Sequence, residues 1–241
     1  MDYYNPVYRL LRTLRVIIIQ FTEFYKLFVK PDLRLEKSLW RQGYQRVVGI
    51  DEVGRGALAG PVTVAGVLLQ PGLGKIPPKL KEVRDSKKLT FRQREALYPP
   101  LTRAGCLSWA AASSSARVID QVGIVKAIEQ AIKQVVRKLS PVDFLILDGG
   151  LSISWPLEQR SLVKADEKIF SVAAASIIAK VRRDRWMVHY HSLYPVYNFK
   201  QHKGYGTKEH RQVLEALGFC QIHRQTFKSS APNEVQPPKL G

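Results

Sequence analysis

Short, largely apolar runs recur along the central part of the chain. Each is four to eight residues long, and most end near glycine, proline or an acidic residue, a pattern typical of buried strands. We expect strands at 46–50, 62–69, 106–112, 144–147 and 161–164. Only a glycine-rich turn separates the first two, which predicts a hairpin.

Helical spacing of apolar positions alternates with the later strands. Within 123–138, isoleucine and valine recur at i, i+4, i+8, i+11 and i+12 with charged residues elsewhere, which predicts an amphipathic helix with one core face. Small and branched apolar residues predict a closely packed helix at 170–187, and a last helix is expected at 208–217. Strands followed by alternating helices and strands favour an α/β layer with a mixed sheet.

The two ends of the 241-residue chain lack this pattern. Residues 1–38 contain an Arg-rich stretch whose apolar part is interrupted by polar residues. We expect an N-terminal extension of unknown role there, with an upstream start-site artefact or an organelle-targeting peptide as the alternatives. Residues 229–241 contain three prolines and no apolar periodicity, which predicts disorder. One domain is therefore expected at 39–228.

The charge balance is strongly basic. Thirty-eight Lys and Arg against twenty Asp and Glu give a formal net charge of +18. Such an excess favours a polyanionic partner, since these side chains displace condensed counterions, although a solvated basic surface is the alternative. Two cysteines, Cys106 and Cys220, are too few for a disulfide framework or a zinc site and favour a reducing, cytoplasmic compartment. No apolar run reaches the roughly 18 residues of a membrane span, so we expect no membrane association.

Four acidic residues follow predicted strands: Asp51, Glu52, Asp148 and Asp166. Strand ends are where α/β folds bring side chains from neighbouring strands together. Clustered carboxylates repel unless cations neutralise them, and hard divalent ions such as Mg²⁺ and Mn²⁺ prefer oxygen ligands. The residues therefore predict an acidic metal site, while a helix cap or a surface carboxylate is the alternative for any one of them.

The turn between the first two predicted strands begins Gly54-Arg55-Gly56. Glycines let backbone N–H groups approach a phosphate closely, and the Arg55 guanidinium offers a second contact, although a tight hairpin is the simpler alternative. The turn is neither a Walker loop nor a dinucleotide fingerprint, which disfavours nucleotide-driven enzymes.

Basic residues gather near possible phosphate paths: Lys87, Lys88, Lys180, Arg182, Arg183, Lys200, His202 and Lys203. Tyr205 stands between two glycines, and such an aromatic ring can lie flat against a sugar or base, or be an ordinary loop tyrosine.

Seven blocks of the sequence resemble, in order, the motifs of type 2 ribonuclease H, specifically bacterial ribonuclease HII. They are GIDEVGRGALAGP at 49–61, DSKKL at 85–89, LDG at 147–149, KAD at 164–166, AAASIIAKV at 173–181, RD at 183–184 and HKGYGT at 202–207. The resemblance covers about 39–227. It departs from the family pattern at Ala165, where glycine is usual, and at Gly150, where asparagine is common.

The resemblance implies a ribonuclease H-like catalytic domain with a mixed β-sheet flanked by helices and a helical C-terminal part. It also implies endonucleolytic hydrolysis of the RNA strand of RNA–DNA hybrids. DNA duplexes would be incised 5′ of embedded ribonucleotides, leaving 5′-phosphate and 3′-hydroxyl ends. Two Mg²⁺ or Mn²⁺ ions about 4 Å apart would activate a water and stabilise the leaving oxygen.

The residue roles implied by the resemblance fall into two sets. The metal-binding and catalytic carboxylates would be Asp51, Glu52, Asp148 and Asp166. The substrate-binding residues would be Gly54, Arg55, Gly56, Lys87 and Tyr205, with the glycine-rich turn on the ribonucleotide backbone and Tyr205 at the ribo-to-deoxy junction.

Two other functions remain as alternatives. A non-catalytic basic nucleic-acid-binding module would use the charge alone, but it leaves the strand-end acids unexplained. Another two-metal nuclease of the same fold, acting on DNA junctions, would not need Tyr205 or the glycine-rich turn. A sliding-clamp peptide needs an apolar residue three positions after its glutamine, and Gln221 is followed there by Arg224, so we expect no such motif. We expect a monomer.

Overall fold

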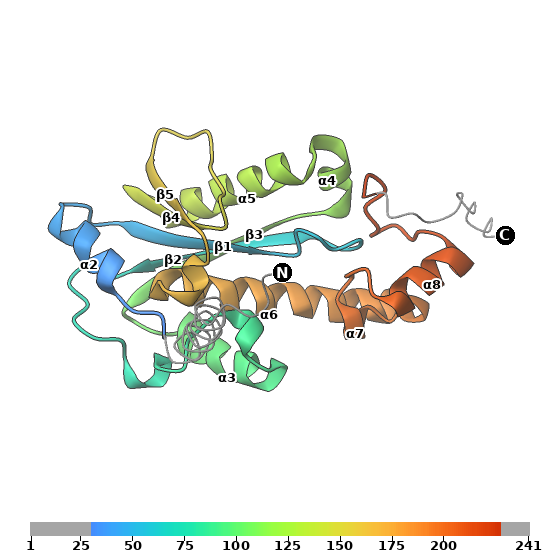
Figure 1. The fold of residues 1–241 in the computed structure, drawn as a ribbon, viewed down its shortest axis with the longest axis horizontal. Coiled ribbons are helices and arrows are strands. Elements are labelled where there is room, and N and C mark those ends of the chain that lie inside the picture. The colour runs from blue at the N-terminus through green and yellow to red at the C-terminus, as the bar shows by residue number, and fades with distance from the viewer. Residues whose placement is uncertain (1–29, 228–241) are drawn as a thin grey trace, which may run out of the picture. The chain divides into compact units, whose positions relative to one another are not determined.

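A five-stranded mixed sheet forms the centre of the computed structural model, which describes residues 30–227 (Figure 1). The strands are β1 (Val47–Val53), β2 (Val62–Leu69), β3 (Leu107–Ser114), β4 (Phe144–Asp148) and β5 (Glu158–Leu162). Their order across the sheet is β3-β2-β1-β4-β5. The pairs β1–β2 and β2–β3 are antiparallel, whereas β1–β4 and β4–β5 are parallel. The predicted hairpin and mixed sheet are confirmed.

Helices cover both faces of this sheet (Figure 1). One face carries α4 (Ala116–Val122) and α5 (Ile124–Leu139), and the other carries α3 (Phe91–Thr102) and α6 (Phe170–Leu193). The remaining helices are α2 (Arg34–Arg41), α7 (Phe199–His202) and α8 (Lys208–Leu217), with 3₁₀ turns η1 (Pro78–Leu80), η2 (Ser86–Lys88), η3 (Ala165–Glu167) and η4 (Pro195–Tyr197). The last two helices form the helical C-terminal part that was expected.

The two long helices bury their apolar faces against the strands. On α5, Ile128, Ile132 and Val135 are almost fully buried, as their helical spacing predicts. The small residues of α6 serve a different need, because this helix lies very close to β1. A Cβ on Gly49 of β1 would stand 2.4 Å from the Ser171 hydroxyl of α6, so only glycine allows this approach.

Two expected strands differ from the observed ones. The prediction of a strand at 161–164 was wrong, because β5 spans Glu158–Leu162. This strand lies at the sheet edge and is largely exposed, so its apolar content could not reveal it. The first strand extends to Val53, so Asp51 and Glu52 lie within it rather than after it. Their pairing with Ala65 and Val64 of β2 continues the ladder through the acidic residues.

The compact unit begins at Pro31, ahead of the expected boundary at 39. Asp32 exchanges backbone hydrogen bonds with the start of α6, since its N–H donates to the Lys168 carbonyl and its carbonyl accepts from Phe170. Leu33 and Glu36 are buried. We therefore propose that the domain starts near residue 31. The expectations for residues 1–29 and for the tail lie outside the described residues.

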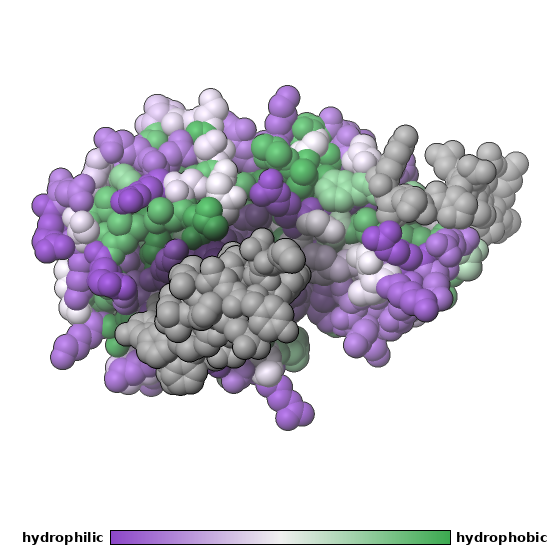
Figure 2. Space-filling view, viewed as in Figure 1, coloured by the Kyte–Doolittle hydropathy of each residue, from purple (hydrophilic) through white to green (hydrophobic). Residues whose placement is uncertain are grey.

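Hydrophilic residues cover much of the surface seen in Figure 2, including the side of α7 and α8. Within residues 30–227, no helix has the length and apolar character needed to cross a membrane.

Candidate functional site

The sheet places acidic residues from two neighbouring strands at the same end. Strands β1 and β4 are parallel and pair Ile50 with Leu147. The next residue on each strand is Asp51 and Asp148, so these two carboxyl groups extend from adjacent positions. The sequence did not show that β1 and β4 are neighbours, and this strand order brings Asp51 and Asp148 together.

Asp166 reaches this site from η3, the turn that leads into α6. The backbone N–H of Ala165 donates a 2.6 Å hydrogen bond to Asp148 Oδ1, which ties the turn to the end of β4. Asp166 is almost fully buried. It was expected after a strand and instead lies in a 3₁₀ turn, where Asp148 is near enough to repel its carboxylate.

Burial and mutual repulsion make this cluster hard to ionise. Burial raises the pKa of Asp51 well above its usual range, with Glu52 adding to the rise. Burial raises the pKa of Glu52 to about 7, with Asp148 contributing and Arg55 opposing. Burial, followed by repulsion from Asp148 and Asp85, raises the pKa of Asp166 to about 6. Such a site gains from a cation that neutralises the carboxylates.

Two basic side chains partly balance the cluster. The Arg55 guanidinium lies 3.9 Å from Glu52 Oε1, and the Lys87 ammonium lies 3.6 Å from Asp166 Oδ2. Burial alone would lower the pKa of Lys87, but the carboxylates of Asp166 and Asp85 raise it. Both cations are themselves exposed, so they are free to meet an anionic ligand at the edge of the site.

The donor set fits a hard divalent cation. All four predicted ligands carry carboxylate oxygens, the type that Mg²⁺ and Mn²⁺ prefer. Asp166 Oδ2 is buried and accepts no hydrogen bond among residues 30–227, with the Lys87 ammonium 3.6 Å away, so this oxygen retains the capacity to bind a cation. In the same part of the chain, no three acidic, histidine or cysteine side chains stand close enough together to hold an ion as they are.

The glycine-rich turn and the Tyr205 loop lie against each other next to the acids. The Leu58 N–H donates to the Gly204 carbonyl at 2.8 Å, which joins the two segments. Arg55 and Gly56 are exposed at the tip of the turn, whereas Gly54 is buried beneath them. Tyr205 is half-buried, with the Arg183 guanidinium 5.3 Å from its ring centroid. The structure thus places Arg55 beside Glu52 and Lys87 beside Asp166, and it joins the glycine-rich turn to the loop of Tyr205.

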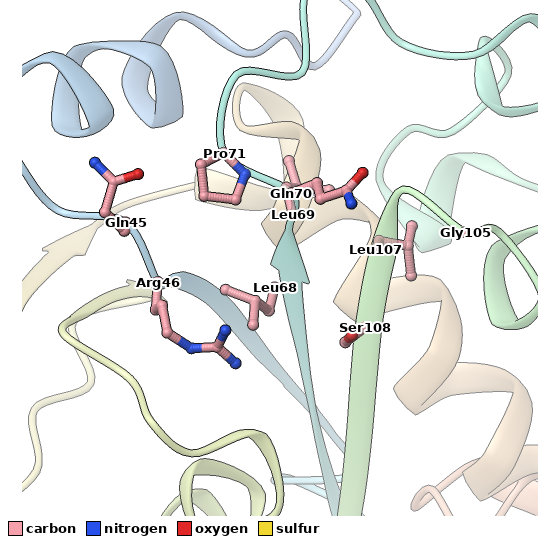
Figure 3. A pocket seen from close by; sticks show the side chains of 9 residues that line it. All are labelled: Gln45, Arg46, Leu68, Leu69, Gln70, Pro71, Gly105, Leu107 and Ser108. Atoms are coloured by element: carbon pink, nitrogen blue, oxygen red, sulfur yellow. The ribbon is translucent and has the colours of Figure 1, made fainter.

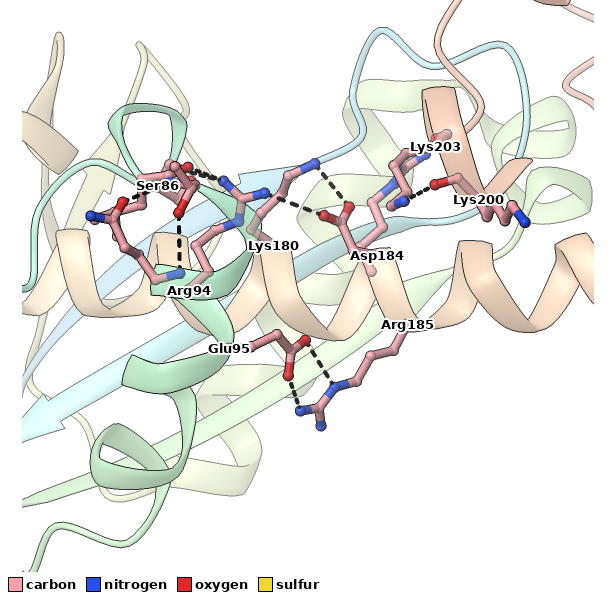
Figure 4. Close-up of polar contacts among 12 residues, drawn as sticks. Ser86, Arg94, Glu95, Lys180, Asp184, Arg185, Lys200 and Lys203 are labelled. Carbon is pink, nitrogen blue, oxygen red and sulfur yellow. Dashed lines mark hydrogen bonds and ion pairs between the residues drawn. The ribbon is translucent and has the colours of Figure 1, made fainter. Parts of the chain in front are cut away.

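A polar network along α6 joins Ser86, Arg94, Lys180 and Asp184 (Figure 4). The Lys180 ammonium also lies 6.0 Å from the centroid of the Tyr205 ring. Asp184 is buried and accepts a 2.8 Å hydrogen bond from Lys180, with Arg94 at 3.8 Å. Arg94 also donates to the Ser86 carbonyl at 2.9 Å, which fixes the turn that carries Lys87. Burial lowers the pKa of Lys180, although its ion pair with Asp184 opposes this effect. Neither Arg94 nor Asp184 was assigned a role from sequence.

Two of the basic residues expected near phosphate do not offer their charge to the surface. Arg183 is fully buried and donates to backbone carbonyls. His202 is buried between the Tyr197 carbonyl, 2.7 Å from its Nε2, and the Gly204 N–H. Burial lowers its pKa and so favours the neutral ring. The expectation was wrong for these two residues because the sequence showed their charge but not their depth.

Three buried histidines, His202, His210 and His223, form a cluster that the sequence analysis did not predict. The Cys220 N–H donates to His223 Nδ1 at 2.9 Å, His223 Nε2 lies 3.0 Å from His210 Nε2, and His210 Nδ1 lies 3.0 Å from the Tyr205 carbonyl. The His202 and His210 rings stack at 4.2 Å. Burial lowers the pKa of His210 to about 4 and that of His223 to about 3. Neutral rings can alternate donor and acceptor along this chain and so hold the Tyr205 carbonyl in place.

A cavity of about 140 Å³ lies away from these residues, at the opposite end of the sheet (Figure 3). It is lined by the residues before β1, the end of β2 and the start of β3: Gln45, Arg46, Leu68, Leu69, Gln70, Pro71, Gly105, Leu107 and Ser108. No carboxylate or histidine lines it, so the chemistry of the candidate site is elsewhere.

The two departures from the family motifs are accommodated locally. Gly150 has a φ of 75°, a left-handed conformation that glycine adopts at little cost and asparagine also tolerates. Ala165 is fully buried, and its N–H makes the hydrogen bond to Asp148 described above.

Comparisons with known proteins agree with the geometry. The family profile described as Ribonuclease HII matches residues 48–230. Ribonuclease HII of Syntrophus aciditrophicus is 43% identical over 208 residues, which cover 85% of this chain and 95% of that protein. Ribonuclease HII of Ruegeria pomeroyi is 45% identical over 204 residues, covering 83% of each.

Solved structures show the same fold. The chain matches the RNase HII in the PCNA:RNase HII complex from Archaeoglobus fulgidus with a TM-score of 0.63 and 25% identity, covering 78% of this chain and 98% of that one. Bst-RNase HIII in complex with Mn²⁺ matches with a TM-score of 0.55 and 19% identity over 73% of this chain and 63% of that one, a likeness of fold alone. The ribonuclease H-like fold expected from the motifs is confirmed. Because the family profile spans most of the chain and relatives above 40% identity cover more than four-fifths of it, the chain belongs to the ribonuclease HII family.

Proposed function

We propose that this chain incises DNA duplexes 5′ of embedded ribonucleotides, leaving 5′-phosphate and 3′-hydroxyl ends. As a member of the ribonuclease HII family it is a metal-dependent hydrolase of the ribonuclease H class that cleaves the RNA strand of RNA–DNA hybrids. The observation that carries the finer proposal is a contiguous surface. Arg55 of the glycine-rich turn lies 3.9 Å from Glu52, and the same turn is hydrogen-bonded through Leu58 to the loop that carries the half-buried Tyr205.

Asp51, Glu52, Asp148 and Asp166 would hold two Mg²⁺ or Mn²⁺ ions. When bound, such ions supply an acidified water nucleophile and charge stabilisation for the leaving 3′-oxygen in an in-line displacement. The chain's own contribution would be to hold Asp51, Glu52 and Asp166 in surroundings that raise their pKa values, so that a bound cation would favour their ionised form. Arg55, beside Glu52, and Lys87, beside Asp166, would orient the phosphates that flank the scissile bond.

The substrate-binding residues would read the ribose. The 2′-hydroxyl is the group that distinguishes RNA from DNA at a given position. The exposed backbone of Arg55 and Gly56 can approach it closely because Gly56 carries no side chain. Tyr205 would pack on the deoxyribose beyond the scissile ribonucleotide, with Arg183 against its ring on the protein side.

We further propose that the enzyme acts as a cytoplasmic monomer without a sliding-clamp motif. The Archaeoglobus relative is described in a complex with PCNA. In this chain the position three residues after Gln221 is Arg224, which is buried and bonded to the glycine-rich turn rather than presented as an apolar anchor.

The test is cleavage of a duplex that contains one ribonucleotide, with and without a chelator. We expect metal-dependent incision, which Asp51→Asn and Asp148→Asn each abolish while binding of the duplex is kept or strengthened, since a negative charge facing the phosphate is removed. Asp143→Asn is the matched control, because Asp143 caps the backbone at the opposite end of β4.

Each alternative predicts a different result. Binding without cleavage would indicate a nucleic-acid-binding module. Cleavage of all-DNA junctions in preference to the ribonucleotide duplex would indicate another nuclease of this fold. Equal losses of affinity and rate in the two variants would show a structural role for the carboxylates.

A further inference from the structure

Two arginines, Arg183 and Arg224, are buried below the glycine-rich turn with 0% and 1% of their surface exposed. Among the described residues, no carboxylate lies within ion-pair distance of either guanidinium group. Burial lowers the pKa of both groups, that of Arg224 to about 9. Burying a cation without an anionic partner costs folding free energy, which its hydrogen bonds must offset. We therefore ask which backbone groups these guanidinium groups hold in place.

Arg224 is bonded to the turn itself. Its guanidinium donates to the carbonyls of Gly54 at 2.7 Å, Arg55 at 2.9 Å and Gly60 at 3.1 Å. The planar fork of donors fixes both ends of the turn at once, and this is a geometry that lysine cannot reproduce.

Arg183 is bonded to the turn and to the Tyr205 loop. It donates to the carbonyls of Pro61 at 2.8 Å and Ala59 at 3.2 Å, and to that of Lys203 at 2.9 Å. Its guanidinium lies 5.3 Å from the Tyr205 ring centroid. A Cβ at Gly54 would stand 2.0 Å from Arg183 Nε, so the turn rests directly on this side chain.

We infer that Arg183 and Arg224 are positioning residues that set the distance between the Gly54–Arg55–Gly56 backbone and the Tyr205 ring. This inference rests on the proposed function of those two elements. A ribonucleotide and the deoxyribonucleotide beyond it must touch both elements at the same time. If the spacing between the two elements is already fixed in the free protein, the entropic cost of ordering them falls on folding and not on substrate binding. A ribo-to-deoxy junction, which contacts both elements, then binds with an advantage over a uniform duplex.

The first test measures order in the protein without metal or substrate. Arg183→Lys and Arg224→Lys are compared with Arg46→Lys, whose parent side chain also donates to backbone carbonyls, those of Leu139 and Pro141, but away from the site. We expect amide hydrogen exchange of the segments 54–61 and 203–207 to accelerate at least tenfold in the first two variants and to be unchanged in the third.

The second test measures selectivity. The ratio of kcat/KM for a single-ribonucleotide duplex to that for a uniform RNA–DNA hybrid should fall at least fivefold in Arg183→Lys and Arg224→Lys and remain unchanged in Arg46→Lys. A merely structural role would lower the active fraction and reduce both rates equally. An unchanged ratio in folded protein, or unchanged exchange, overturns the inference. The two variants are independent, so the one that folds better decides the test. If the wild type does not cleave these substrates, the proposed function fails. The hydrogen-exchange measurement still decides whether the two arginines hold the turn and the Tyr205 loop in place.

Discussion

A substitution at Gly56 can test substrate contact without disturbing the fold. A Cβ built at this position meets no atom within 4 Å, and the backbone does not adopt the left-handed conformation that would require glycine. Nothing in the free protein therefore demands glycine at 56. Gly56→Ala should leave the free energy of unfolding unchanged or raise it by up to about 1 kcal/mol, since alanine restricts the unfolded chain.

The bound state should respond differently. If a ribose approaches the exposed backbone of the turn, the added methyl group stands between the two and breaks the closest hydrogen bond. Leaving such a polar group unpaired costs about 1–3 kcal/mol, which corresponds to a roughly 5- to 150-fold fall in kcat/KM. The loss should be seen with every substrate that places a ribonucleotide at the scissile position.

Two other glycines are controls for this measurement. Gly105→Ala is the matched control, because Gly105 is also exposed with open space around its Cβ position but lies in the turn before β3, at the opposite end of the sheet. Gly54→Ala should instead destabilise the fold, since Gly54 has a φ of +95° and its Cβ would collide with Arg183. The assays are thermal unfolding and kcat/KM on a duplex with one ribonucleotide. Wild-type kinetics in Gly56→Ala, or an equal loss in Gly105→Ala, would refute close approach of the substrate to this turn.

Three further predictions follow from the same structure. Tyr205→Ala should lower kcat/KM on a single-ribonucleotide duplex by roughly tenfold to a hundredfold, the value of a stacking contact of about 1–3 kcal/mol, while Tyr205→Phe should cost far less. Equal damage in both variants would show that the hydroxyl is the active part. Deletion of residues 1–29 should leave the unfolding temperature and kcat/KM unchanged, whereas deletion of 1–38 should lower the unfolding temperature because it removes buried Leu33 and Glu36; equal unfolding temperatures for the two deletions would contradict this. The folded-state pKa of His210 is about 4, below its unfolded value near 6.5, so its contribution to stability is complete above pH 6.5 and is lost as the pH falls toward 4. Between pH 7.5 and 5, the free energy of unfolding of the wild type minus that of His210→Gln should fall by about 2 kcal/mol, and a flat difference would show that the ring is protonated in the folded state.

The sequence by itself determined the elements whose signal is local. Residues 62–69 and 208–217 were predicted with the bounds that β2 and α8 have, because continuous apolar runs and helical spacing are written in neighbouring positions. The four carboxylates were recognised because each follows or ends an apolar run in a chain with few acids. Their convergence was predicted on general grounds. The structure places Asp51 and Asp148 at adjacent positions of β1 and β4 and bonds the turn that carries Asp166 to Asp148, but among residues 30–227 no three of these acids stand close enough to hold an ion.

Tertiary structure alone decided everything that joins distant positions. The exposed edge strand β5 has no apolar signal, because only one neighbour and little core define it. Charge in the sequence did not show that Arg183 and His202 are buried, and nothing local linked His210 to His223. Arg183 bonds to Pro61, 122 positions away, and Arg224 to Gly54, 170 positions away. A hydrogen bond across such a separation leaves no periodicity in the sequence, because the packing of α6 and the C-terminal segment on the sheet is what places its donor and acceptor together.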